Sequence, residues 1–69
     1  MEKEQQRQRI GQRIADLRTQ QGMTQAQLAE HTGILRQHLS RIEQGRYSVG
    51  FDTLQTIAEA LGGNIDIIV

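Results

Sequence analysis

The stretch MTQAQLAEHTGILRQHLSRIEQGR, residues 23–46, decides the fold, because it contains two short helices separated by a glycine turn. Thr24 is a typical helix N-cap, and Gln27 three residues later completes a capping-box pattern. These signals predict a helix of only two turns over Gln25–His31. Gly33 then suits the left-handed backbone that ends such a helix. A two-turn helix, a tight turn and a second helix form the helix-turn-helix pattern.

The second helix of the pair is expected to run from Leu35 or Arg36 to Gln44, and Gly45 ends it. Its apolar residues share one face at helical spacing, namely Leu35, Leu39 and Ile42. The opposite face is polar throughout and holds Arg36, Gln37, Ser40, Arg41 and Gln44. An ordinary surface helix would mix Glu and Lys there, so this face is a candidate binding surface.

Apolar residues at helical spacing also flank this pair of helices. On the N-terminal side a helix that ends at Gly22 carries the stripe Ile10, Ile14 and Leu17. On the C-terminal side a helix is expected over Phe51–Leu61, with Gly50 as its N-cap. The core of the domain is therefore expected between four helices.

The chain divides into three expected segments. Residues 1–9 are almost wholly polar and predict a frayed or solvated helix start, whereas residues 10–62 hold the helix-turn-helix domain. Residues 63–69 are predicted to contain a strand, because the tail is short and rich in β-branched residues. The expected fold class is therefore mainly all-α, with four to five helices and a short C-terminal β-strand.

Composition bounds the chain to one small domain. It has 69 residues, of which 36% are hydrophobic. A core of this size rarely supplies more than about 3–5 kcal/mol, so pairing with a second copy would help. The absence of cysteine excludes disulfides and Cys-based zinc sites and fits a cytoplasmic protein. No apolar run is long enough for a membrane span, and no leader peptide is expected.

Charge is distributed unevenly along the chain, although the formal net charge is zero. Residues 1–47 contain all of the basic side chains and carry a net positive charge, whereas residues 48–69 contain only acidic ones. Nearly all the basic residues are arginine, which suits bidentate recognition of phosphate and guanine. The basic part of the chain is therefore a candidate nucleic-acid surface.

Three blocks of sequence, MTQAQLAEHTGI (23–34), LSRIEQGR (39–46) and FDTLQTIAEALG (51–62), occur in this order. Together they resemble the phage repressor/Cro-type (XRE-like) helix-turn-helix family over about three-quarters of the chain, from Ile10 to Leu61. The resemblance implies a lambda-repressor-like DNA-binding domain in which the second helix of the pair enters the major groove. We call this helix the reading helix. Two features depart from the family pattern: Leu35 replaces the usual Ser or Thr cap, and a strand replaces the frequent fifth helix.

The resemblance also implies roles for individual side chains. Those expected to read base edges are Arg36, Gln37 and Arg41, since Arg pairs with guanine and Gln with adenine. Those expected to contact the DNA backbone are Thr24, Gln25, His38, Ser40, Gln44, Arg46 and Tyr47. Arg18 and Glu43 match a structural ion pair that joins the first helix to the reading helix.

Catalysis and metal binding do not fit the residues present. His31 and His38 lie on different helices without a thiolate nearby, so no metal is expected. His38 and Ser40 point to nearly opposite sides of one helix, which argues against a triad with Asp52. The glycines are turn residues and form no phosphate loop. The protein is therefore expected to be no enzyme and to need no cofactor.

These features predict a homodimer that binds double-stranded DNA at a pseudo-palindromic operator and regulates transcription by repression. The alternative is an antitoxin, similar to those of the HipA-kinase type, which binds a protein toxin and represses its own operon. A helix-turn-helix domain used only for protein contacts conflicts with the Arg and Gln side chains on the reading helix.

The tail is the expected dimerisation element. Ile65–Val69 is the only strand-like segment, so its backbone would need antiparallel pairing with a second copy. On such a strand, Ile65, Ile67 and Val69 would cover the last helix. Ile68 would point the other way and pack against the second copy. The rival arrangement pairs the ends of the reading helix and of the last helix, as in other members of the family.

Overall fold

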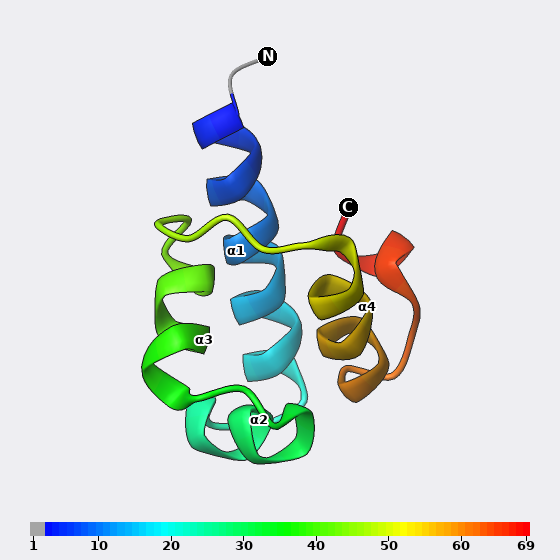
Figure 1. The fold of residues 1–69 in the computed structure, drawn as a ribbon. Coiled ribbons are helices and arrows are strands. Elements are labelled where there is room, and N and C mark those ends of the chain that lie inside the picture. The colour runs from blue at the N-terminus through cyan, green and yellow to red at the C-terminus, as the bar shows by residue number, and fades with distance from the viewer. Residues whose placement is uncertain (1–2) are drawn as a thin grey trace.

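Figure 1 shows the computed structural model, which describes residues 3–69 as a bundle of short helices. The elements in chain order are α1 (Lys3–Gln20), α2 (Gln25–Thr32), α3 (Arg36–Glu43), α4 (Phe51–Ala60) and the 3-10 turn η1 (Ile65–Ile67). The polar segment 1–9 begins with two residues that lie outside the described ones. From Lys3 onward this segment is the largely exposed start of α1. The predicted helices are therefore present, with ends that differ by a residue or two.

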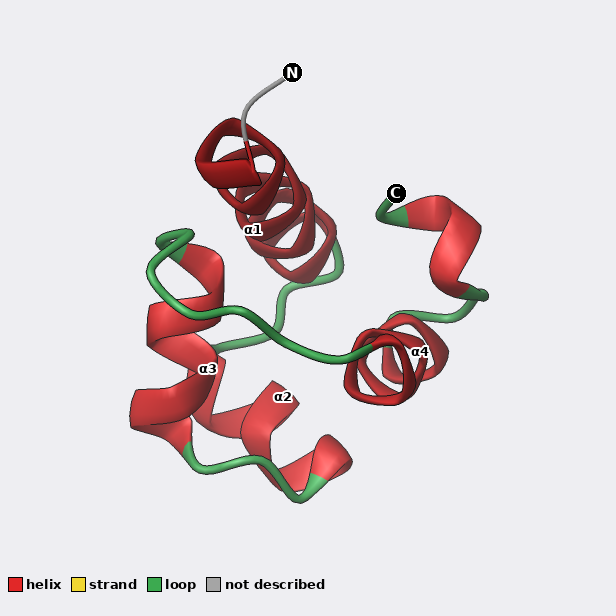
Figure 2. Cartoon of the chain, turned by 45° about the horizontal axis from the view of Figure 1, so that its top comes forward, coloured by secondary structure: helices red, strands yellow, loops and turns green. Residues whose placement is uncertain are grey.

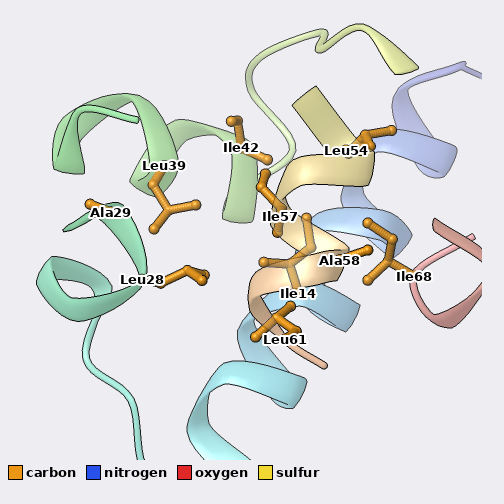
Figure 3. Close-up of a cluster of buried hydrophobic side chains, with 10 residues drawn as sticks. All are labelled: Ile14, Leu28, Ala29, Leu39, Ile42, Leu54, Ile57, Ala58, Leu61 and Ile68. Carbon is orange, nitrogen blue, oxygen red and sulfur yellow. The ribbon is translucent and has the colours of Figure 1, made fainter. Parts of the chain in front are cut away.

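The core lies where all these elements meet (Figure 3). Helix α3 packs against α1 and α2, while α4 packs against α2 and η1. Each helix and the tail contributes one side chain to the fully buried set, which is Ile14, Leu28, Leu39, Ile57 and Ile68. Full burial of such a side chain stabilises by about 1.5–3 kcal/mol, so the small core needs every element.

The helix-turn-helix motif has the local geometry that its sequence predicts. The Thr24 hydroxyl accepts from the Gln27 backbone N–H at 3.1 Å, and the Thr24 N–H donates to Gln27 Oε1 at 2.9 Å. This reciprocal capping box begins α2. Gly33 ends the helix with a φ of 75°, and its N–H donates to the Ala29 carbonyl at 2.9 Å. A turn built in this way sets the direction in which α3 leaves α2.

Leu35 does not join the core, which corrects the expectation that it shares the apolar face of the reading helix. It is the N-cap of α3, with extended backbone angles (φ −61°, ψ 140°), and its side chain is 67% exposed. The helical spacing that places Leu39 and Ile42 in the core does not apply one residue outside the helix. The start of α3 at Arg36 follows from the same geometry.

The predicted C-terminal strand is wrong. Among residues 3–69 the structure contains helices, turns and loops, and Figure 2 shows no strand in the tail. Residues 65–67 instead form a 3-10 turn that packs on α4. In this turn Ile65 accepts from the Ile68 N–H at 3.1 Å. The β-branched composition is overridden by local hydrogen bonds and by burial of one side chain.

The tail backbone also finds partners within the chain, so the hydrogen-bond argument for a strand-paired dimer fails. The Ile65 N–H donates to Gln55 Oε1 at 2.9 Å, and Arg13 Nε donates to the Ile67 carbonyl at 2.9 Å. Ile68, expected to face a second copy, is 1% exposed and belongs to the core. Val69 is exposed instead. The three-residue period of a 3-10 turn explains this reversal, because it places residue 68 on the side of residue 65.

None of the helices within residues 3–69 combines the length and the apolar character that a membrane crossing requires.

Candidate nucleic-acid interface

The outward face of α3 forms an open hollow of about 560 Å³. Its lining side chains are Arg36, Gln37, Ser40, Arg41 and Gln44 of α3, together with Arg46 and Tyr47 of the turn that follows. We call this surface the α3 hollow. It brings together all the side chains predicted to read bases and most of those predicted to contact the DNA backbone.

The α3 hollow is positively charged. Arg36, Arg41 and Arg46 are exposed, and among residues 3–69 no acidic side chain lines the hollow. Gln44 Nε2 donates to Ser40 Oγ at 3.0 Å, so these two side chains support each other one turn apart. Arginine presents a rigid fork of donors, while glutamine offers one donor and one acceptor group. The surface can therefore bind phosphate and can also distinguish base edges.

A bidentate ion pair fixes α3 on its inner side. Arg18 Nε donates to Glu43 Oε2 at 2.8 Å, and its Nη2 donates to Glu43 Oε1 at 3.0 Å. Arg18 Nη1 also donates to the Met23 carbonyl at 2.9 Å, which ties in the turn before α2. Hydrogen bonding to Glu43, more than any other cause, raises the pKa of Arg18 above its ordinary value. The ion pair of Arg18 and Glu43, which was expected from the sequence, thus joins α1, the α1–α2 turn and α3.

Thr24 and Gln25, predicted as backbone contacts, lie at the start of α2 outside the α3 hollow. Thr24 is exposed, and its hydroxyl can still donate while it accepts within the capping box. Gln25 is half-buried, and its Nε2 donates to Glu43 Oε1 at 3.0 Å. The same carboxylate therefore holds both Arg18 and Gln25.

His38 lies apart from the α3 hollow. Its ring contacts the ring of Tyr47 in a tilted arrangement, with a centroid separation of 4.4 Å and an angle of 51° between the planes. Both rings line a second hollow of about 330 Å³, which also includes Leu35 and Val49. Tyr47 lines both hollows and forms the boundary between them. Because His38 faces this second hollow, its predicted backbone contact has the weakest geometric support.

Neither histidine belongs to a metal site in the described part of the chain. His31 is exposed on α2, away from His38 on α3. Within residues 3–69 no group of three His, Asp or Glu side chains is arranged to hold a metal ion.

Two glycines, Gly11 and Gly45, position α3, and this role was not expected from the sequence. A Cβ at Gly11 would lie 2.6 Å from the Glu43 carbonyl oxygen and closer still to that of Ile42. A Cβ at Gly45 would lie 2.8 Å from Gln8 Cα, and Gly45 also has a φ of 74°. The close approach of α1 to α3 therefore depends on glycine. For Gly11 the sequence did contain a signal, because this glycine is isolated inside a helical pattern and such a glycine often marks a close contact.

Comparison with known proteins places these features in a family. The model of the family HTH_3 (Helix-turn-helix) matches residues 14–68. The immunity repressor protein of Bacillus phage phi105 is 42% identical over 60 residues, a match that covers 87% of this chain and 42% of that protein. An uncharacterized HTH-type transcriptional regulator of Methanothermobacter thermautotrophicus is 43% identical over 49 residues, covering 71% of each chain. The chain therefore spans less than half of the phage repressor.

Solved structures with the same fold include small regulators. The restriction-modification controller protein C.AhdI of Aeromonas hydrophila superposes with a TM-score of 0.87 at 29% identity, covering 90% of this chain and 94% of that one. The clp gene regulator ClgR of C. glutamicum gives a TM-score of 0.87 at 30% identity, covering 91% and 82%. Each of these superpositions covers about nine-tenths of this chain.

Proposed function

The chain belongs to the HTH_3 helix-turn-helix family of DNA-binding transcriptional regulators, and we propose that it represses transcription as a homodimer bound to a pseudo-palindromic operator. The observation that carries the proposal is the α3 hollow, which combines exposed arginine and glutamine side chains and which, in the described part of the chain, has no acidic lining. Relatives support the same use, since one is named an immunity repressor and another a transcriptional regulator.

In this proposal α3 lies in the major groove with the α3 hollow against the base edges. Arg36 and Arg41 suit guanine, because a guanidinium can donate to O6 and N7 together. Gln37 suits adenine, where its amide donates to N7 and accepts from N6. Each such bidentate contact discriminates against a wrong base by about 1–3 kcal/mol.

The remaining polar side chains are proposed to bind phosphates on either side of the groove. Arg46 supplies the charged contact beside α3, and Gln25 supplies a neutral one at the start of α2. Further contacts of this kind are assigned to Thr24, Ser40, Gln44 and Tyr47, whereas His38 faces the second hollow, on the side of the proposed contact between copies. Such contacts fix the register of the protein on the duplex without reading its sequence.

Salt titration of binding to a labelled duplex tests this division of roles. The log–log slope is expected to be about −0.9 for each phosphate neutralised by a cation. Arg46→Ala should therefore make the slope shallower by about one unit. Gln25→Ala should weaken binding with nearly the same slope, because the lost contact is uncharged. Affinity for DNA that is independent of salt would contradict the proposed interface.

The two copies are proposed to meet at the ends of α3 and α4. Leu35 precedes α3 and Phe51 begins α4, and these apolar side chains are 67% and 68% exposed. Leu35 lines the second hollow together with Val49 and Gly50, and Phe51 directly follows Gly50 in the chain. Contact with a second copy would remove this apolar surface from water and would leave the α3 hollow of each copy open to DNA.

A further inference from the structure

Glu43 is a buried acid that gathers donors from two other helices. Its side chain is 5% exposed, and it sits on the inner side of α3. One oxygen, Oε2, accepts from Arg18 Nε at 2.8 Å. The other, Oε1, accepts from Arg18 Nη2 and from Gln25 Nε2, each at 3.0 Å. The ion pair with Arg18 therefore does not account for the bond from Gln25.

The bond from Gln25 has a directional consequence. A glutamine amide carries two N–H donors on one planar group. When one of them is held by a carboxylate, the amide is restrained and the second N–H has a narrower range of directions. Donation to an ionised oxygen is also stronger than donation to a neutral one. A half-buried Gln25 at the start of α2 is therefore ordered before any ligand arrives.

Arg18 reduces the electrostatic repulsion that Glu43 would otherwise exert on DNA. A bare carboxylate close to the start of α2 would repel a DNA phosphate. The bidentate pair with Arg18 neutralises the charge of Glu43, and both side chains are largely buried, at 13% and 5% exposure. The amide of Gln25 can thus be held by an anion without presenting net negative charge to DNA.

We propose that Glu43 is a positioning residue for DNA binding, which holds the Gln25 amide so that its second N–H meets a backbone phosphate. The inference rests on the proposed function, since it assigns the support of one contact in that interface. The same carboxylate is part of α3, so it links the phosphate contact of α2 to the placement of the reading side chains. Preorganisation of this kind avoids the entropic cost of ordering a free side chain upon binding.

A double-mutant cycle in DNA affinity tests the proposal. The probe is a duplex that the parent protein selects from a random pool, and the variants are Gln25→Ala, Glu43→Gln and their combination. Gln25→Ala is expected to weaken binding about tenfold, as for one hydrogen bond to a charged group. Glu43→Gln should weaken binding at least as much in the parent, because it also breaks the ion pair with Arg18 that fixes α3. In the Gln25→Ala background its effect should be several-fold smaller, since the part that acts through Gln25 is already lost. Fully additive losses would overturn the proposal.

Two controls separate positioning from a general loss of structure. Gln12→Ala removes an exposed amide that donates to Asp16 within α1, and it should leave DNA affinity unchanged. Denaturation curves for each variant establish that the cycle compares folded proteins.

The side-chain amide of Gln25 in the parent protein gives a readout that needs no variant. Nuclear magnetic resonance without DNA should show a rigid amide with one strongly shifted proton, and addition of the selected duplex should move the second proton. A mobile amide with averaged signals would overturn the proposal even if Glu43→Gln fails to fold. If the parent binds no duplex DNA, the proposed function fails and this inference fails with it. If the parent binds and the cycle is additive, only the inference fails.

Discussion

At the scale of single residues, Arg41 and Gln37 carry the proposed reading of sequence. Both are exposed on the outward face of α3 and line the α3 hollow. Neither makes a contact on which the core depends, so substitutions at these positions test recognition more than folding.

Arg41→Ala or Gln37→Ala is expected to cost about 1–3 kcal/mol of affinity for the selected duplex and to relax preference at one position in each half-site. The physical reason is the loss of a bidentate contact to one base. Arg9→Ala is the matched control, because Arg9 is exposed on α1. Its Nη2 donates to Gln6 Oε1 on the same helix at 3.0 Å. Both variants binding as tightly as the parent would show that another face reads the DNA.

Much of the residue-scale picture can be predicted from the sequence, because local rules determine it. The capping box at Thr24 and the turn at Gly33 depend on neighbours within three or four positions. The polar face of α3 follows from helical spacing alone. The bond between Gln25 and Glu43 joins residues 18 positions apart on two helices, and no local pattern indicates it.

At the scale of elements, the contact between α1 and α3 determines where the α3 hollow lies. Gly11 allows α1 to approach the last turn of α3, near the carbonyl groups of Ile42 and Glu43. Gly11→Ala should destabilise the fold by about 1–3 kcal/mol, because forced overpacking outweighs the better helix propensity of alanine. Chemical denaturation monitored by circular dichroism measures the change.

Gly50→Ala is the control for this prediction, since a Cβ at Gly50 would meet nothing within 4 Å. Its expected cost is smaller and arises from the weaker N-cap alone. A Gly11→Ala protein more stable than the parent would show that α1 and α3 can separate slightly without loss.

The C-terminal tail shows why an element can defy prediction from sequence. Its β-branched residues favour a strand, but a strand needs a partner and the described chain supplies other bonds instead. Gln55 and Arg13, from α4 and α1, reach the tail backbone at 2.9 Å each. Burial of Ile68 then favours a 3-10 turn over an extended segment. Contacts between residues this far apart in sequence are visible only in the folded chain.

At the scale of the whole molecule, the proposed binding to a pseudo-palindromic operator requires two copies of the chain. Phe51→Glu is expected to convert the proposed dimer to a monomer, because it places a charge in the proposed apolar contact. The fold should survive, since an acid in the first turn of α4 interacts favourably with the helix dipole. Sedimentation without DNA measures the mass directly.

Val69→Glu provides the matched control for dimerisation. Val69 is 54% exposed and belongs to the C-terminal tail, whereas the proposed contact uses Leu35 and Phe51 at the starts of α3 and α4. The same apolar-to-acid change there should leave the dimer intact. A Phe51→Glu protein that sediments as the parent does would place the contact between copies elsewhere.

Selection of duplexes from a random pool by the parent protein tests the central claim most directly, namely that two copies read DNA through α3. The account predicts that the enriched duplexes share a two-fold symmetric sequence, with half-sites about 34 Å apart along the helix axis. An unchanged pool after repeated rounds, or enrichment without symmetry, would contradict it.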